Sequence, residues 1–230
     1  MFKDEVLKAL DYTLTDEQLK KFDTYFQLLV DYNKHTNLTR ITNEEDVYIK
    51  HFLDSLLLTK LIDFKTIEKV CDMGAGAGFP SIPILVIYPH LKVSIVESQI
   101  KRIQFLNELI KALSLDVDIV HERAEVYAKT HQQTFDLVTA RALGELNIIL
   151  EYGIPMLKEN GYFIAPKGSK YEEELDNAKN ALKTLKSSVI KVDTLELPSD
   201  LGFRANLLIQ KKHHVENYPR AYPMILKKPL

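Results

Sequence analysis

The stretch V-C-D-M-G-A-G-A-G, residues 70–78, constrains the fold of this chain more than any other segment. Apolar residues lead into an acid and then into glycines at every second position, beginning with Gly74 and Gly76. Phe79 and Pro80 follow, and proline is favoured in the first turn of a helix. A strand, a glycine turn and a helix N-terminus form the place where an α/β sheet holds a nucleotide-like ligand.

The glycine spacing distinguishes between classes of ligand. The dinucleotide fingerprint G-x-G-x-x-G/A requires a small residue at position 79, and this chain has Phe79 there. The pattern D-x-G-x-G-x-G instead resembles motif I of the S-adenosylmethionine-dependent methyltransferases. Glu97 ends the next predicted strand, about 20 residues after the first glycine, where a carboxylate accepts hydrogen bonds from ribose hydroxyls. This acid argues against the alternative, a glycine turn that holds no ligand.

Composition sets limits on the class of protein. The chain has 230 residues, 46% of them apolar and 27% charged, as expected for one α/β domain with an appendage. Its one cysteine, Cys71, excludes an internal disulfide framework and, inside a predicted strand, indicates a buried thiol. The charged start M-F-K-D-E and the lack of an 18-residue apolar run argue against a signal peptide and a membrane span, so we expect a cytoplasmic protein.

Charge is distributed unevenly along the chain. The net charge of −2 argues against a protein that coats nucleic acid by charge alone. From Arg204 to Leu230, however, there are six Lys or Arg residues and one acid, Glu216. This excess either contacts phosphates or forms a solvated tail.

The first 65 residues have helical patterns. Thr15-x-x-Gln18 and Thr42-x-x-Glu45 are capping-box sequences that predict two helix starts. The polar segment Tyr32–Thr42 is predicted to be a loop between the two helices. The second helix has a wide apolar stripe, which predicts burial on two sides.

From about Ile67 the chain alternates between predicted strands and helices, which indicates a parallel sheet covered on both faces. The predicted strands are Ile67–Met73, Lys92–Val96, Val117–His121, Phe135–Ala140, Tyr162–Pro166, Val189–Leu195 and Ala205–Lys211. The predicted helices are Pro80–Tyr88, Ile100–Ser114, Leu143–Gly153 and Tyr171–Lys186. The last two strands lack a helix between them, so they are expected to form a hairpin that adds one antiparallel strand at the sheet edge.

Beyond motif I, several segments occur together in the order typical of one family. The chain resembles the bacterial ribosomal RNA small subunit methyltransferase G family, also called glucose-inhibited division protein B. The segments that carry the resemblance are Y-N-K-H-T-N-L-T (32–39), I-K-H-F-L-D-S-L (49–56), D-M-G-A-G-A-G-F-P-S-I-P (72–83), K-R-I-Q-F-L (101–106), R-A-E (123–125), T-A-R-A (139–142) and K-G (167–168). The tail Y-P-R-A-Y-P-M-I-L-K-K-P-L departs from the Y-P-R-K-P-G-T-P-N-K-x-P pattern of similar members.

The resemblance implies an α/β, Rossmann-like class I methyltransferase with a seven-stranded, mostly parallel sheet and an N-terminal helical extension. We expect residues 1–65 to form that extension, 66–212 the methyltransferase core and 213–230 a basic tail. The implied reaction is N7-methylation of one guanine in the decoding-region loop of 16S ribosomal RNA, with S-adenosylmethionine as donor. The expected partner is 16S RNA or the small ribosomal subunit, and the expected oligomeric state is a monomer.

The chemistry of this reaction determines which residues to look for. Guanine N7 carries a lone pair and no proton, so its attack on a sulfonium methyl needs alignment rather than a general base. Arg141, which follows the fourth strand, is predicted to orient the cofactor carboxylate or the O6 edge of guanine and is the catalytic candidate. The alternative for Arg141 is a structural salt bridge.

The other predicted cofactor contacts follow strand ends and the resemblance. They are Gly74, Gly76, Phe79, Glu97, Ala124 and Glu125, together with Arg141. Phe79 is alternatively a core residue under the following helix, and Glu125 is alternatively a surface helix-capping acid.

Contacts with RNA are expected from cations near the ligand edge and in the tail. The candidates are Lys101, Arg102, Lys167 and Arg220. His51 and Asp54, three residues apart on a predicted helix, either pair structurally or face the RNA. No histidine has metal-ligand spacing with cysteine or acids, so no metal site is predicted.

Two other functions are compatible with these patterns. A methyltransferase acting on a small molecule or a protein would use the N-terminal helices as a substrate lid. A non-catalytic RNA-binding or cell-division factor would keep the pocket as a vestige, but the intact glycine turn, Glu97 and Arg141 argue against it.

Overall fold

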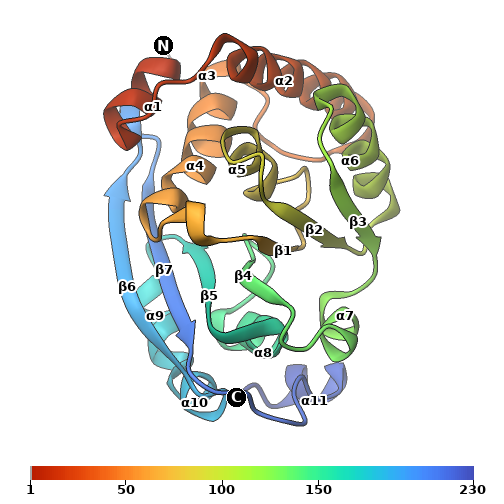
Figure 1. Ribbon diagram of the computed structural model, residues 1–230, viewed down its shortest axis with the longest axis vertical. Coiled ribbons are helices and arrows are strands. Elements are labelled where there is room, and N and C mark those ends of the chain that lie inside the picture. Colours follow the sequence, from red (N-terminus) through yellow and green to blue (C-terminus); the bar gives the residue numbers. More distant parts are fainter. Residues whose placement is uncertain (1) are drawn as a thin grey trace.

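The computed structural model describes residues 2–230 as a seven-stranded sheet between two layers of helices (Figure 1). The strands are β1 (Lys69–Met73), β2 (Lys92–Glu97), β3 (Val117–His121), β4 (Phe135–Thr139), β5 (Leu157–Lys167), β6 (Ser187–Glu196) and β7 (Phe203–Lys211). Their order is β3-β2-β1-β4-β5-β7-β6, and the neighbours from β3 to β5 pair in parallel. The predicted fold class and strand count are therefore confirmed.

The last hairpin lies differently from the prediction. β7 pairs antiparallel with both β5 and β6, so the single antiparallel strand is inside the sheet and β6 forms the edge. Burial explains this order, because β7 is largely buried whereas β6 alternates between exposed and half-buried residues. A strand buried in this way is stable only with a neighbour on each side.

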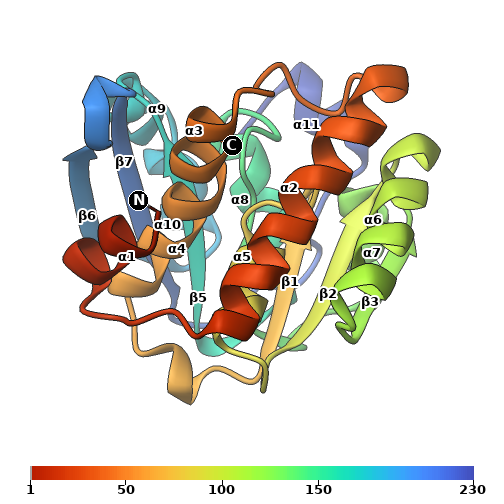
Figure 2. The same cartoon turned by 90° about the horizontal axis from the view of Figure 1, so that it is seen from above.

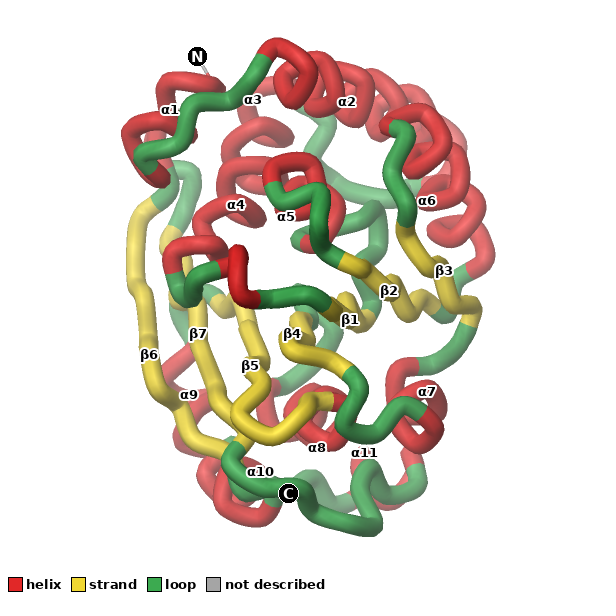
Figure 3. Tube along the Cα trace, in the orientation of Figure 1, coloured by secondary structure: helices red, strands yellow, loops and turns green. Residues whose placement is uncertain are grey.

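Helices cover both faces of the sheet (Figures 2 and 3). On one face lie α5 (Ser81–Ile87) and α6 (Ile100–Leu113), and α2 (Asp16–Thr36) packs on both. On the other lie α7 (Ala124–Thr130), α8 (Leu146–Met156), α9 (Tyr171–Asn177) and α10 (Lys179–Thr184), with α8 contacting the other three. Each layer has its own apolar cluster, one including Phe22 and Phe105 and the other including Phe135 and Phe163.

The N-terminal helices start close to the predicted positions but differ in detail. They are α1 (Phe2–Leu10), α2 (Asp16–Thr36), α3 (Glu44–Val47), a π-helical turn (Tyr48–Leu53) and α4 (Asp54–Leu57), followed by 3₁₀ turns at Leu58–Lys60 and Phe64–Thr66. The Thr15–Gln18 capping box is present. The second predicted box is wrong, because the side chain of Asn43 caps α3 by accepting from the Asp46 N–H.

The predicted loop Tyr32–Thr42 is also partly wrong, since α2 continues to Thr36. Asn37 then ends the helix in the left-handed conformation, at φ 52°, where asparagine is tolerated. The side chain of Asn33 orders the loop that follows by accepting from the Thr39 N–H. The polar residues of this segment therefore form a partly exposed last helical turn, which hydrophobic periodicity does not reveal.

Several predicted boundaries move at the core helices and strands. α8 starts at Leu146 rather than Leu143, where the Glu174 carboxylate accepts the Leu146 N–H. The predicted helix Tyr171–Lys186 is two helices that meet at Ala178. β5 starts at Leu157, five residues earlier than predicted.

The C-terminal tail lies against the α7–α8 side of the molecule (Figure 1). The tail contains α11 (Tyr222–Lys227). Elsewhere in the chain, a 3₁₀ turn at Pro198–Asp200 lies between β6 and β7. Cys71 is buried in β1, as predicted. Among residues 2–230, no helix combines the length and apolar character needed to cross a bilayer.

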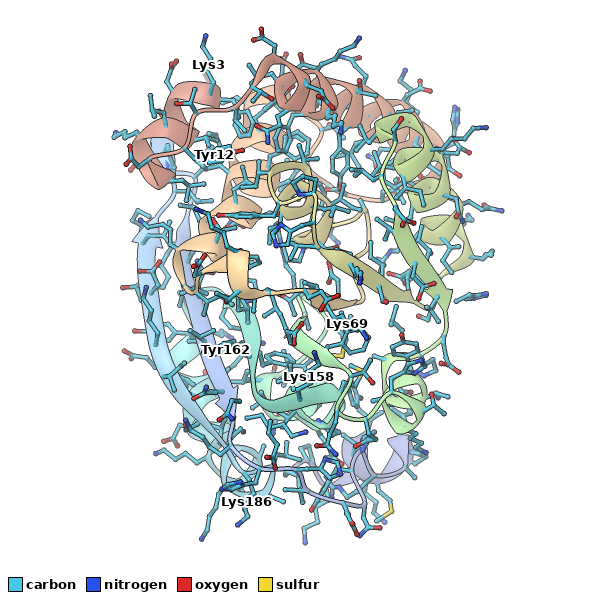
Figure 4. The ribbon with its side chains drawn as sticks, in the orientation of Figure 1. Lys3, Tyr12, Lys69, Lys158, Tyr162 and Lys186 are labelled. Carbon is cyan, nitrogen blue, oxygen red and sulfur yellow. The ribbon has the colours of Figure 1, made fainter. Side chains whose placement is uncertain are left out.

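Asp136 lies at the amino-terminal edge of the sheet, opposite the glycine turn. The Asp136 carboxylate accepts the Lys69 N–H at 2.8 Å and the Lys158 ammonium at 2.6 Å, and both lysines are labelled in Figure 4. These bonds tie the starts of β1 and β5 together. Ligand chemistry is therefore expected at the other edge, where the parallel strands end.

Candidate functional site

The glycine turn leaves β1 where the chain order of the sheet reverses, since β1 lies between β2 and β4. Gly74, Gly76 and Gly78 all have positive φ, at 69°, 61° and 96°. Residues with a Cβ adopt these angles only with strain, so the turn requires glycine at each of these positions. A crevice at a switch point between parallel strands is where open α/β sheets bind ligands.

The three glycines differ in what surrounds them. A Cβ on Gly74 would lie 2.6 Å from Leu143 Cδ1, and one on Gly78 would lie 2.7 Å from the Tyr25 hydroxyl. A Cβ on Gly76 would meet nothing within 4 Å. Gly76 is therefore the glycine that faces open space, and the first glycine, Gly74, packs against the loop after β4.

Asp72, the acid that begins the motif, lies under the turn and is fully buried. Its Oδ2 accepts the Ser81 N–H at 3.1 Å, at the start of α5. Burial raises the pKa of Asp72 to about 7. This carboxyl group therefore anchors α5 to β1 through Oδ2, while its Oδ1 is buried and accepts no hydrogen bond from residues 2–230.

Glu97 lies at the end of β2, beside the turn, as predicted. Its Oε1 accepts the backbone N–H groups of Ser98 and Gln99, and its Oε2 accepts the Gly76 N–H at 3.2 Å. The fourth contact is long, with Arg102 Nη1 at 3.4 Å. A ribose hydroxyl would replace that contact, so the carboxylate and the open side of Gly76 fit a nucleoside-containing cofactor.

Phe79 is buried between two rings from the N-terminal helices. It stacks on Tyr25, with 5.3 Å between ring centroids, and on His51, with 4.4 Å. Its exposed fraction is 6%. This packing matches the alternative core role and joins the glycine turn to the N-terminal extension.

Arg141 follows β4 at the same edge, and its guanidinium is held by the π-helical turn. Its Nη2 donates to the Lys50 carbonyl and to His51 Nδ1, both at 2.9 Å, and its Nη1 lies 3.5 Å from Asp54 Oδ2. Nη1 is buried and makes no hydrogen bond to any residue among 2–230. Burial lowers the pKa of Arg141, and Asp54 opposes this effect.

The π-helical geometry explains why the Lys50 carbonyl can receive Arg141. In an α-helix the Asp54 N–H would bond to this carbonyl, but here it bonds to the carbonyls of Ile49 and His51. The His51 ring accepts from Arg141 at Nδ1, and its Nε2 lies 3.0 Å from the Thr39 hydroxyl. Burial lowers the pKa of His51 to about 3, so the ring is neutral and can accept.

Ala124 and Glu125 begin α7, directly after β3. Glu125 is buried and pairs with Arg123, so it is not a surface capping acid. The Arg123 guanidinium also lies 4.2 Å from the ring centroid of Tyr222 in α11. The edge predicted to hold adenine therefore contacts the C-terminal tail.

The predicted RNA contacts have different surroundings. Lys101 is exposed in the first turn of α6, while Arg102 reaches Glu97. Lys167 pairs with Glu174 at 2.5 Å, and Arg220 pairs with the buried Glu151 at 2.6 Å.

Three of the six cations of the C-terminal segment, Arg204, Lys211 and Arg220, are held by contacts within the protein, whereas Lys212, Lys227 and Lys228 are exposed. Arg204 Nε donates to both oxygens of Asp54, at 3.0 and 3.1 Å. Lys211 is buried and donates to the carbonyls of Pro155 and Leu157, and burial lowers its pKa to about 8. The cations that remain exposed are therefore fewer than the composition of the segment suggests.

The structure brings Gly76, Glu97, Phe79 and Arg141 to one edge of the sheet, together with the start of α7. Asp54 and Arg204, 150 residues apart, complete the group, and sequence reasoning did not connect them. The spacing of His51 and Asp54 was the available signal, but the two side chains do not pair with each other: His51 contacts Arg141 and Thr39, and Asp54 contacts Arg204 and Arg141. Within residues 2–230, no three His, Cys, Asp or Glu side chains gather as metal ligands would.

Comparisons with known proteins agree with this arrangement. A family model described as GidB, rRNA small subunit methyltransferase G, matches residues 18–201. The chain is 58% identical over 230 residues to the Ribosomal RNA small subunit methyltransferase G of Acholeplasma laidlawii, with 100% of both chains covered. It is 47% identical over 221 residues to the protein of that name from Staphylococcus aureus, covering 95% of this chain and 91% of the relative.

Solved structures share the fold at low identity. TYW2 of M. jannaschii in complex with AdoMet aligns with a TM-score of 0.58 and 17% identity, covering 76% of this chain and 80% of that one. A ribosomal protein L11 methylase of Lactobacillus delbrueckii aligns with a TM-score of 0.55 and 18% identity, covering 75% and 81%.

Proposed function

Because the chain belongs to the rRNA small subunit methyltransferase G family, we propose that it methylates N7 of one guanine in 16S ribosomal RNA. The protein is an S-adenosylmethionine-dependent rRNA methyltransferase. The observation that carries the proposal is the set of side chains at the switch point. They include the Glu97 carboxylate and the Arg141 guanidinium, whose Nη1 makes no hydrogen bond within residues 2–230, and both groups can position a ligand. Positioning is what attack by an unprotonated nucleophile needs, since no general base has to remove a proton.

In this proposal the residues of the edge have separate tasks. Gly76 and Glu97 hold the nucleoside part of the cofactor, which supplies the methyl group carried on its sulfonium. Ala124 and Glu125 bound the adenine side. Arg141 is fixed by Lys50 and His51, and its positively charged guanidinium is held next to the reacting atoms. Guanine N7 forms the new C–N bond with its lone pair, and no proton has to be removed.

We also retain as proposals the parts of the sequence interpretation that concern assembly. These are the division into residues 1–65, 66–212 and 213–230, a monomeric enzyme and a cytoplasmic location. The substrate is proposed to be 16S RNA, as free RNA or within the small subunit, because the family is defined by small-subunit rRNA. Lys101 remains a proposed phosphate contact, since it is exposed on the ligand edge.

The direct test is to map N7-methylguanine in 16S RNA from cells with and without the gene. We expect one guanine to lose the modification in the deletion strain and to regain it when purified protein and S-adenosylmethionine are added. Methyl incorporation into metabolites or proteins, with unchanged RNA, would favour the other methyltransferase function instead.

His51 provides a separate test of how Arg141 is held. His51→Gln removes the acceptor at the Nδ1 position, and we expect the rate of methyl transfer to fall about tenfold, or ~1.4 kcal/mol. His51→Asn places an oxygen near Nδ1 and should stay within about threefold of the wild type. Both variants lose the ring stacked on Phe79, so equal losses would assign the effect to stacking rather than to Arg141.

A further inference from the structure

A polar cavity of about 390 Å³ lies beside the cofactor edge, where β4 and β5 end. Its charged lining residues are Asp54, Arg141, Lys167, Glu174 and Arg204. They come from α4, the loop after β4, the end of β5, α9 and the start of β7. The volume is in the range of pockets that bind small ligands, and a nucleobase is of suitable size for it.

The cavity adjoins the glycine turn through the loop that follows β4. Arg141, Ala142 and Gly144 of this loop line the cavity, and Leu143 between them packs against Gly74. The loop therefore contacts the glycine turn through Leu143 and lines the cavity through its other residues, so the cavity is adjacent to the turn. An acceptor base in the cavity would be next to the donor.

The charges of the cavity form two groups, and only in the second does the acid have an oxygen that accepts no hydrogen bond from residues 2–230. Asp54 is 4% exposed, and both of its oxygens accept from Arg204. Glu174 accepts the Lys167 ammonium and the Leu146 N–H, in both cases at Oε2. Its Oε1 accepts no hydrogen bond from residues 2–230.

Lys167 and Glu174 thus present a donor and an acceptor side by side. The Lys167 ammonium, which also donates to the Gly144 carbonyl at 3.0 Å, can use its third proton for a ligand. The unused Glu174 oxygen can accept from one or two N–H groups. This pattern is complementary to the Watson–Crick edge of guanine, where O6 accepts and N1–H and the 2-amino group donate.

We propose that this cavity binds the acceptor guanine, with Lys167 donating to O6 and Glu174 accepting from N1–H and the 2-amino group. The inference rests on the proposed function and names the residues that select the base. Enzymes that modify a base read it by hydrogen bonds to its Watson–Crick edge once it has left the stack. Lys167, which the sequence predicts to contact RNA, then contacts a base rather than a phosphate.

This geometry rejects adenine for a chemical reason. When N7 of the base points toward the methyl group, the substituent at position 6 must point toward Lys167. Adenine would place an amino group against the ammonium of Lys167 and the N1 lone pair against the carboxylate of Glu174. Both contacts are repulsive, so the pair selects guanine without contacting N7.

The same carboxylate assists the reaction itself. When N7 forms its bond to the methyl carbon, the sulfur keeps the electron pair of the broken bond and the base becomes a cation. The N1–H of that cation is a stronger donor, so its hydrogen bond to Glu174 strengthens as the reaction proceeds. Interactions that strengthen toward the transition state accelerate the chemical step.

The test combines a change in the base with a change in the protein. Small subunits are reconstituted with 16S RNA that carries guanosine or inosine at the mapped position, because inosine lacks the 2-amino group. Full-length wild type should methylate inosine roughly 5- to 150-fold more slowly than guanosine. In Glu174→Gln this inosine penalty should shrink to about threefold or less, while S-adenosylmethionine affinity by calorimetry is unchanged. Any intrinsic difference in N7 reactivity is the same for both enzymes and cancels.

Two further arms make the result decisive. Glu173→Gln removes the same charge from an exposed position of α9 and should keep the wild-type inosine penalty. If Glu174→Gln does not fold, Lys167→Met is assayed with 6-thioguanosine, which keeps N1–H and the 2-amino group but replaces O6 by a weaker acceptor, and the 6-thioguanosine penalty of the wild type should be lost. Equal rates on guanosine and inosine in the wild type, or penalties that the variants leave unchanged, overturn the assignment. No transfer to guanosine by the wild type would overturn the proposed function itself.

Discussion

A Gly76→Leu variant is expected to fold and to bind S-adenosylmethionine at least about 100-fold more weakly than the wild type, a loss of ~2.7 kcal/mol or more. Gly76 has a φ of 61°, so a side chain that is not branched at Cβ, such as leucine, costs about 1–2 kcal/mol of strain there. A Cβ at this position meets no protein atom within 4 Å, and the leucine side chain would extend into that open space beside Glu97. Calorimetric titration measures the affinity, and thermal unfolding shows that the variant is folded.

Gly78→Ala is the matched control. Gly78 belongs to the same glycine motif, but a Cβ at this position would face protein atoms rather than open space. Its Cβ would lie 2.7 Å from the Tyr25 hydroxyl and 2.8 Å from Ile82 Cγ1. Overpacking of this kind typically costs about 1–3 kcal/mol of stability, in addition to the strain of a φ of 96°. We therefore expect Gly78→Ala to lower the unfolding temperature more than Gly76→Leu does. If Gly76→Leu binds the cofactor normally, the open side of this glycine is not the cofactor site.

The sheet was predictable because its signals are local. The strands of the parallel part are short apolar segments bounded by turn residues, and most connections contain a helix with regular apolar spacing. The exception is α7, which was not predicted because its seven residues are too few for a periodic signal. The order of the last two strands was not predictable in the same way, since a hairpin can add to an edge by either of its strands. The choice is made by burial, and β7 is the strand with the more apolar residues on both faces.

The glycine turn and Glu97 were located correctly because both lie at strand ends, where sequence position determines position in space. The surroundings of Arg141 were not predictable, since its partners lie about 90 residues earlier in the chain. A π-helical turn has no distinct periodicity in a short segment, so its released carbonyl is visible only in the structure. The sequence predicts that Arg102 and Lys167 are available to contact RNA, but in the structure each pairs with an acid that the fold brings close to it.

The N-terminal extension and the core form one site as a result of these contacts. The rings of Tyr25 and His51 enclose Phe79, and Asp54 lies between Arg141 and Arg204. A shift of the extension would therefore move both the glycine turn and the cavity after β4. This connection is why we assign the extension a part in positioning the reaction rather than the role of a separate lid.

Arg220→Ala is expected to lower the free energy of unfolding by about 3–5 kcal/mol. Glu151 is fully buried in α8 and accepts from Arg220 Nε at 2.8 Å, from Nη2 at 2.6 Å and from the backbone N–H at 2.9 Å. The variant leaves this carboxylate buried with only the backbone donor, and an uncompensated buried charge is costly. Chemical denaturation measures the loss, and filter binding measures the affinity for 16S RNA.

This prediction separates two roles for Arg220. If the arginine binds RNA, as its sequence context suggests, RNA affinity falls while stability changes little. If its task is to hold the tail on α8, stability falls and RNA affinity of the folded variant stays within about twofold.

Lys227→Ala is the control, since it removes the same charge from an exposed position of the tail and should change stability by no more than ~0.5 kcal/mol. A double variant, Glu151→Leu with Arg220→Met, should recover most of the lost stability, because replacing both partners leaves no buried charge unpaired. Failure of the double variant to recover would show that the pair contributes through the position of the tail itself and not through neutralising Glu151.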